Sequence, residues 1–265
     1  MYTIVITNMK GGVGKTSTTI ELGAGLARHG KKVLVIDLDQ QRNLTDYLPF
    51  EEQPQKTIYN VLIADCSVED TITHIESLGF DVIAGTESLS KADRMFVDND
   101  DKYLLEDTIK CIEDVMPDRY EYILVDTGPT RNILMTMAYV AADYIIVPAE
   151  CDAGSREGLR AIESDVEKLK NSRDHASHAK SLGYILTKYE PTNMHNVAFE
   201  ELVRIANEKE YKPFVLNVRK SVKMSEIKEF KTSIFEYQKD GNPSIDYEEI
   251  VKEIIRRMGE EEEGR

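Results

Sequence analysis

The residues best suited to chemistry lie in a glycine-rich stretch near the N-terminus, which reads Met-Lys-Gly-Gly-Val-Gly-Lys-Thr over residues 9–16. Lys15 is long enough to reach the terminal phosphates of a nucleotide, and the Thr16 hydroxyl can ligate Mg²⁺. Glycines let successive backbone N–H groups point at a phosphate from close range. The residues expected to contact nucleotide are Lys10, Gly11, Gly12, Val13, Gly14, Lys15, Thr16 and Ser17.

The flanking residues supply the elements that would position this stretch. An apolar run at 2–7 predicts a strand, and apolar residues with helical spacing at 17–30 predict a helix that ends at a glycine. Residues 32–37 are again apolar and β-branched, as buried parallel strands are. A right-handed strand–helix–strand crossover places Lys15 and Asp37 at one edge of a sheet, with the helix dipole directed at the phosphates.

The stretch departs from the ordinary phosphate loop, G-x-x-x-x-G-K-[ST], because Met9 replaces glycine and a second lysine, Lys10, follows it. This deviant Walker A form, K-G-G-x-G-K-T, resembles the ParA/MinD superfamily of dimerising ATPases. The resemblance implies that Lys10 crosses to the nucleotide of a partner subunit in an ATP-dependent homodimer. It implies ATP and Mg²⁺ as cofactors.

Residues 37–45, Asp-Leu-Asp-Gln-Gln-Arg-Asn-Leu-Thr, resemble the superfamily's D-x-D-P-Q-G-N segment. The resemblance implies that Asp37 helps to organise magnesium and that Asp39 positions the attacking water. The chain departs from the pattern at Gln40 and Arg42, where proline and glycine are usual. An aspartate-rich helix cap is the alternative interpretation. The expected catalytic residues are Lys10, Lys15 and Asp39.

Residues 120–129 form an apolar strand that ends in Asp126, with the form of a Walker B segment. In such segments the aspartate helps to hold magnesium. The segment resembles Y-D-x-I-x-x-D-T-P-P, with Gly128 in place of one proline. Strands that end in aspartate are common, so this segment alone is weak evidence for a magnesium site. The phosphate loop upstream makes that interpretation strong. The expected metal-binding residues are Thr16, Asp37 and Asp126.

A basic segment near the C-terminus, residues 218–226, is similar to the superfamily's I-P-R-N-V-R-L-S-E. Two of its lysines fall on the two arginines of that pattern, and an arginine replaces the proline. The resemblance implies contact with non-specific DNA by the ATP-bound dimer, since such cations neutralise phosphates without reading sequence. Surface charge with no ligand is the alternative. The candidate DNA-binding residues are Arg219, Lys220 and Lys223, with support from Lys228 and Lys231.

The composition limits the class of protein. The 265 residues carry a net charge of −15, which opposes nucleic-acid binding overall, yet residues 204–231 hold eight basic side chains against four acidic ones. No apolar run is long enough to span a membrane, and we expect no signal peptide. The three separated cysteines are expected to be reduced thiols. We therefore expect a cytoplasmic protein, and the resemblance to ParA-like proteins implies that it associates with the nucleoid.

No linker rich in glycine, serine or proline divides the chain, so we expect one α/β domain over residues 1–258. The expected fold is that of a P-loop NTPase, with a mostly parallel twisted sheet and helices on both faces. Strands are predicted near 80–84, 120–126, 143–148, 183–188 and 213–216. Residues 259–265 contain four successive glutamates and are predicted to be a disordered acidic tail.

The resemblance implies a ParA-like ATPase for plasmid or chromosome partitioning, with slow turnover that a ParB-like partner accelerates. A MinD-like membrane-cycling regulator needs a basic amphipathic C-terminal helix, which the glutamates oppose. A nitrogenase-like iron protein would need cluster cysteines, and a bacterial tyrosine kinase a tyrosine cluster; neither pattern is present. A DNA-binding regulator with negligible hydrolysis stays open. Where the superfamily places an asparagine that reads adenine, this chain has Thr187-Lys188.

Overall fold

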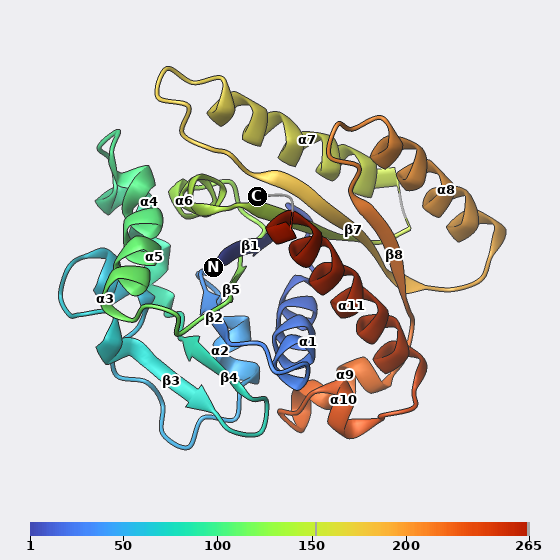
Figure 1. Cartoon of the computed structure of the whole chain (residues 1–265), viewed down its shortest axis with the longest axis horizontal. Coiled ribbons are helices and arrows are strands. Elements are labelled where there is room, and N and C mark those ends of the chain that lie inside the picture. The colour runs from blue at the N-terminus through green and yellow to red at the C-terminus, as the bar shows by residue number, and fades with distance from the viewer. Residues whose placement is uncertain (152, 264–265) are drawn as a thin grey trace.

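A computed structural model describes residues 1–151 and 153–263 (Figure 1). Within these ranges the strands form one eight-stranded sheet in the order β3-β4-β2-β5-β1-β6-β7-β8. Only β3 is antiparallel to its neighbour, and the other pairs are parallel. The strands are β1 (Tyr2–Ile6), β2 (Val33–Asp37), β3 (Ile72–Ile75), β4 (Phe80–Ile83), β5 (Tyr122–Asp126), β6 (Tyr144–Ala149), β7 (Lys180–Tyr189) and β8 (Phe214–Arg219).

Helices cover both faces of this sheet (Figure 1). α1 and α11 lie on one face, while α5 to α8 lie on the other. The helices are α1 (Lys15–Arg28), α2 (Asn43–Tyr47), α3 (Ile58–Leu62), α4 (Ala92–Met95), α5 (Leu104–Val115), α6 (Ile133–Ala141), α7 (Ala153–Lys170), α8 (Asn193–Asn207), α9 (Lys223–Glu229), α10 (Ile234–Tyr237) and α11 (Asn242–Glu263). This arrangement confirms the predicted α/β fold.

Alternation along the strands explains the two layers. In β1, Ile4 and Ile6 are buried in the core under α1 and α11, whereas Val5 is buried in the core under the opposite helices. Successive side chains of a strand point to opposite faces, so a continuous apolar run fills both cores at once. This is why the central strands read as unbroken apolar segments.

The position of β1 between β5 and β6 locates the site. The carboxyl ends of all the parallel strands lie at one edge of the sheet, and Asp37 and Asp126 are register partners at the ends of β2 and β5. The phosphate loop leaves the end of β1 at this same edge. Ligands of open α/β sheets bind at such a crevice, outside the carboxyl ends of the strands.

The structure differs from the C-terminal prediction over residues 259–263. We expected a disordered tail over residues 259–265, but α11 continues through Glu263 and crosses the expected boundary at 258, while residues 264 and 265 lie outside the described residues. The last described turn is held by side-chain contacts, because Glu261 pairs with Lys180 at 3.0 Å and accepts a hydrogen bond from the Tyr144 hydroxyl. The strand β3 was not predicted either. In the part of the chain that is described, no helix is both long and apolar enough to cross a bilayer.

Candidate nucleotide site

The phosphate loop runs from the end of β1 to the start of α1 at Lys15. Gly12 and Gly14 adopt φ values of +77° and +87°, a conformation that strains any residue with a side chain. One side chain that the motif did not predict holds the loop. Asn8 donates to the Pro148 carbonyl at 2.7 Å and accepts from the Lys10 N–H at 2.9 Å. The loop is therefore fixed by β6 before any ligand binds.

Lys15 is buried, with 7% of its surface exposed, and its Nζ donates to the Lys10 carbonyl at 3.3 Å. Burial lowers the pKa of Lys15, and the nearby carboxylates of Asp126 and Asp39 oppose that shift. An ammonium removed from water attracts a phosphate more strongly than an exposed one does. This placement supports the predicted role of Lys15 in phosphate binding.

Thr16 and Asp126 are brought together as the motifs predicted. The Thr16 hydroxyl donates to Asp126 Oδ2 at 2.7 Å, and the Asp126 carboxyl group is fully buried. Burial, followed by repulsion from Asp37, raises the pKa of Asp126 to about 8. A divalent cation would remove that repulsion, so the chemistry of this pair suits Mg²⁺.

The donor set also agrees with magnesium in another respect. Among the described residues, no group of three or more His, Cys, Asp or Glu side chains could hold a metal ion. Mg²⁺ keeps several waters and is usually bound by one or two carboxylates together with substrate phosphates. The described residues therefore fit Mg²⁺ that is held partly by the phosphates of ATP, rather than Mg²⁺ that is held by protein ligands alone.

Asp37 is directed at its own loop rather than at Thr16. Its Oδ2 accepts hydrogen bonds from the Thr45 N–H at 2.9 Å and the Thr45 hydroxyl at 2.6 Å, and its Oδ1 accepts one from the Asp39 N–H at 3.1 Å. Burial raises the pKa of Asp37 to about 6, although these hydrogen bonds oppose the shift. In this structure Asp37 organises the segment that carries Asp39, and no sequence signal identified Thr45 as its partner.

Asp39 lines the cavity beside the loop, and its Oδ1 accepts a hydrogen bond from the Gln41 N–H at 3.0 Å. Gly128 explains how it fits, because a Cβ at that position would lie 2.6 Å from Asp39 Oδ1. Arg42 adopts a left-handed φ of +46°, which accounts for the glycine usual at that place. Two of the departures from the family pattern, Arg42 and Gly128, are thus tied to the conformation around Asp39.

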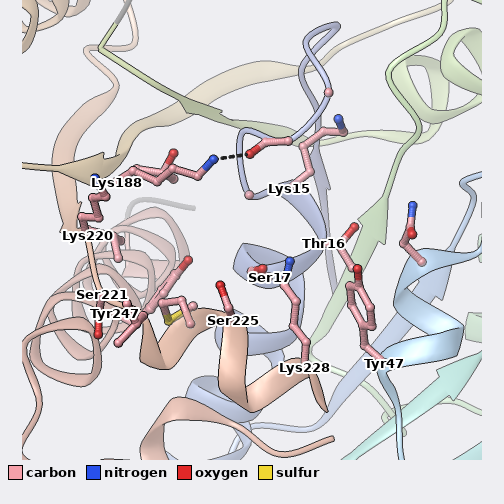
Figure 2. Close-up of a pocket in the computed structure, with 18 of the residues that line it drawn as sticks. Lys15, Thr16, Ser17, Tyr47, Lys188, Lys220, Ser221, Ser225, Lys228 and Tyr247 are labelled. Carbon is pink, nitrogen blue, oxygen red and sulfur yellow. Dashed lines mark hydrogen bonds between the residues drawn. The ribbon is translucent and has the colours of Figure 1, made fainter. Parts of the chain in front are cut away.

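Lys10 lies at the mouth of the site, where its Nζ pairs with Glu150 at 3.3 Å. Lys188 pairs with the same carboxylate and also donates to the Gly12 carbonyl at 2.9 Å, the hydrogen bond drawn in Figure 2. Glu150 follows β6 and Lys188 lies near the end of β7. Within one chain, Lys10 is therefore directed toward the end of β6.

A cavity of about 530 Å³ joins the phosphate loop to the segment after β8 (Figure 2). This volume is within the usual range for a small-molecule site. Lys15, Thr16 and Ser17 line one part, and Lys220, Ser221 and Lys228 line another. The sequence predicted a DNA-binding surface for this segment and did not predict that it forms a wall of the nucleotide cavity.

The three candidate DNA-binding residues have different surroundings. Arg219 makes a two-pronged ion pair with the mostly buried Asp246 of α11, with Nη2–Oδ1 and Nε–Oδ2 distances of 2.6 and 3.0 Å. Lys220 pairs with Glu190 at 2.9 Å, and Lys223 pairs with Glu226 at 2.8 Å. Lys220 is more exposed than Arg219, with 61% of its side-chain surface accessible against 38%, whereas Lys223, at 39%, is exposed to the same extent as Arg219.

The fold and this site define a P-loop NTPase. Residues 1–178 match the family model described as an AAA domain. The chain is 32% identical over 257 residues to the chromosome partitioning protein ParA of Caulobacter vibrioides, covering 96% of this chain and 94% of that protein. It is 31% identical to the sporulation initiation inhibitor protein Soj of Bacillus subtilis, covering 95% and 97%. The chain therefore belongs to the ParA family of partition ATPases.

A solved structure agrees with the fold. The crystal structure of a putative plasmid partition protein from Borrelia burgdorferi, bound to AMPPNP, matches this chain with a TM-score of 0.79 and 23% identity. The match covers 97% of this chain and 99% of that one. At this level of identity the likeness establishes a shared architecture.

Proposed function

We propose that this protein partitions plasmid or chromosomal DNA through a cycle driven by ATP. ATP and Mg²⁺ bind at residues 10–17, two chains then associate, and the dimer binds DNA without sequence preference. Hydrolysis, stimulated by a ParB-like partner, releases the DNA. The observation that carries the proposal is the joint placement of Lys15, Thr16 and Asp126 around a loop that also carries Lys10.

In the proposed hydrolysis, Lys15 and the first N–H groups of α1 bind the phosphates. Asp39 accepts a hydrogen bond from the attacking water and holds that water in line. Mg²⁺, when bound with Thr16 and Asp126, would neutralise charge on the transferred phosphoryl group. Lys10 leaves Glu150 and contacts the partner's nucleotide, adding charge stabilisation in the transition state. Turnover of a single chain is slow because this lysine comes from the partner.

Lys220 and Lys223 are the proposed DNA contacts, since their ammonium groups reach solvent and their carboxylate partners lie on the surface. Exposed ion pairs are weak, so a phosphate can replace the carboxylate at little cost. Dimerisation doubles the number of such lysines and strengthens a contact that is weak in one chain. We place the protein in the cytoplasm, on the nucleoid.

The membrane-cycling alternative gains no support from α11. Its apolar residues Ile250, Ile254 and Met258 are buried in the core with α1 and the sheet rather than presented to solvent. The regulator with negligible hydrolysis differs from the proposal in one measurable quantity, which is the rate of ATP hydrolysis with DNA and without it.

DNA co-sedimentation with ATP, ADP or no nucleotide tests the proposal. The native protein should sediment with DNA only when ATP is present, because ATP is needed for the dimer. Lys15→Ala should lose nucleotide binding and should not sediment in any of the three conditions. Sedimentation of the native protein that is independent of nucleotide would contradict the proposed cycle, and binding to anionic vesicles instead of DNA would favour the membrane-cycling class.

A double variant tests the proposed contacts. Lys220→Ala with Lys223→Ala should weaken DNA binding for all sequences and flatten its dependence on salt, since each lost phosphate contact reduces that slope by about one. Lys110→Ala with Lys168→Ala is the matched control, because both of those lysines are exposed and paired on other helices. Equal losses for the two double variants would show that only overall charge matters.

A further inference from the structure

Lys228 differs from the other cations of its segment. It lies on α9, half-buried, and its Nζ sits over the ring of Tyr47, 5.0 Å from the centroid. Among the described residues, no hydrogen bond or ion pair joins its ammonium group to another side chain or carbonyl. By contrast, Arg219, Lys220 and Lys223 each pair with a carboxylate. A desolvated cation without a counter-charge is costly unless a ligand supplies one.

The electrostatic surroundings agree with this interpretation. Burial lowers the pKa of Lys228, the charge of Lys188 lowers it further, and Asp126 acts in the opposite direction. Both neighbouring groups belong to the nucleotide site, since Lys188 lines the cavity and Asp126 accepts a hydrogen bond from the Thr16 hydroxyl. The protein places several positive side chains around one cavity and leaves this one without a partner.

The direction in which the Lys228 side chain points indicates what kind of ligand it contacts. Figure 2 shows Lys228 rising from α9 toward Ser17, beside Tyr47, inside the cavity that Lys15 and Thr16 also line. Ser17 belongs to the first turn of α1, where free N–H groups and the helix dipole favour an anion. An anion bound there would lie between the start of α1 and α9.

We propose that Lys228 is a further nucleotide-binding residue, which contacts the phosphate chain of the bound nucleotide from the Ser17 side of the cavity. The inference rests on the proposed function, because it takes a nucleoside polyphosphate as the occupant. It also gives α9 a link to the nucleotide. Lys223, a proposed DNA contact, lies on the same seven-residue helix, so a phosphate held by Lys228 constrains the segment that carries it.

Two other roles account less well for the same side chain. A structural cation–π contact with Tyr47 is worth about 0.5–1 kcal/mol at an exposed site, which does not offset the burial of an unpaired charge. A direct DNA contact would require an ammonium group that faces solvent, whereas this one faces the cavity.

The test compares four proteins by calorimetric titration with ADP and Mg²⁺: the native chain, Lys228→Met, Lys228→Arg and Lys231→Met. Methionine keeps an unbranched stem over Tyr47 and removes the charge. We expect Lys228→Met to bind ADP about 10-fold to 100-fold more weakly, as for a lost charge-assisted hydrogen bond. Lys228→Arg should stay within a few-fold of native. Lys231→Met, three residues away, should match the native protein.

Melting temperatures without nucleotide separate binding from structure. Removing an unpaired, half-buried charge should leave the melting temperature of Lys228→Met unchanged or raise it, while the shift caused by ADP becomes smaller. Native-like ADP affinity in Lys228→Met would overturn the inference. So would a lower melting temperature with equally weak binding in both Lys228 variants, which would indicate a packing role. If the native protein itself binds no ADP, the proposed function fails and takes the inference with it.

Discussion

The two walls of the nucleotide cavity, the phosphate loop at residues 9–17 and the segment at residues 218–231, both present lysines but use them differently. In the loop, the backbone conformation fixes where each lysine goes, because Gly12 and Gly14 hold left-handed φ values and α1 begins at Lys15. In the segment, cations close together in sequence pair with different neighbours. The difference shows that sequence spacing predicts the position of a lysine when the backbone conformation fixes it, as in the loop, and not when the side chain depends on its neighbours, as in the segment.

The two walls are also joined through the core. Glu21 of α1 is fully buried, and its carboxylate accepts a hydrogen bond from the Ile234 N–H, with distances of 3.2 and 3.0 Å to its two oxygens. Ile234 begins α10, which packs beside α9 and α1 (Figure 1). One side chain of α1 thus binds the chain three residues after the segment that forms the opposite wall.

The largest predicted effect is a loss of ATP hydrolysis, caused by a substitution in the phosphate loop. Lys10→Ala should bind nucleotide within a few-fold of native, because Lys10 pairs with Glu150 at the mouth of the site rather than in its own phosphate cradle. Its ATP turnover should fall about 10²-fold to 10³-fold, as when a donor to the transition state is lost. The measurements are ATP hydrolysis and the molar mass with ATP by light scattering.

Lys188→Ala is the matched control for Lys10→Ala, since Lys188 pairs with the same carboxylate. It should still form a dimer with ATP. If instead Lys188→Ala abolished the dimer while Lys10→Ala hydrolysed ATP at the native rate, Lys10 would not be the residue that contacts the partner's nucleotide.

A pH effect tests the link between the walls. Burial raises the pKa of Glu21 from its ordinary value of 4.5 to about 8, so the folded chain keeps a proton that the unfolded chain loses between these values. Stability should therefore fall as pH rises through this window and level off above it. Glu21→Gln should reduce that slope by up to about 1.4 kcal/mol per pH unit.

Urea unfolding of the nucleotide-free chain at pH 5, 6.5 and 8 measures this slope. Asp37 and Asp126, with pKa values raised to about 6 and about 8, titrate in the same direction and leave some slope in the variant. Glu248→Gln, on the partly exposed part of α11, is the control and should keep the native slope in this window. An unchanged slope in Glu21→Gln would show that Glu21 is ionised in the folded chain.

The smallest predicted effect is a difference in the free energy of unfolding between variants of two cations in the segment at residues 218–231. Arg219→Ala should lower the free energy of unfolding by about 1–3 kcal/mol, because it removes the charged partner of the mostly buried Asp246 carboxylate and leaves it the backbone N–H of residue 219. Lys220→Ala should cost at most about 1 kcal/mol, since its pair with Glu190 is exposed. Chemical denaturation of both variants gives the comparison, and equal losses would contradict a structural role for Arg219.

Much of the site could be predicted because its signals are local. The loop fixes the relation of Lys15 and Thr16 within a few residues, and parallel strands must bring Asp37 and Asp126 to one edge. The partners of those residues could not be predicted. Thr45 binds Asp37 and Asn8 ties the loop to Pro148 across 140 residues, and neither contact leaves a pattern in the sequence.

The sequence by itself determined the phosphate loop, the parallel sheet and the carboxylates at its edge, because each follows from backbone conformation or from apolar alternation within one element. Only the tertiary structure decided which lysines of residues 218–231 face the cavity, which pair on the surface, and that α11 reaches Glu263. Long charged side chains take their direction from whatever lies next to them, and two of the neighbours are far away along the chain: Lys220 pairs with Glu190 after β7, and Arg219 pairs with Asp246 of α11.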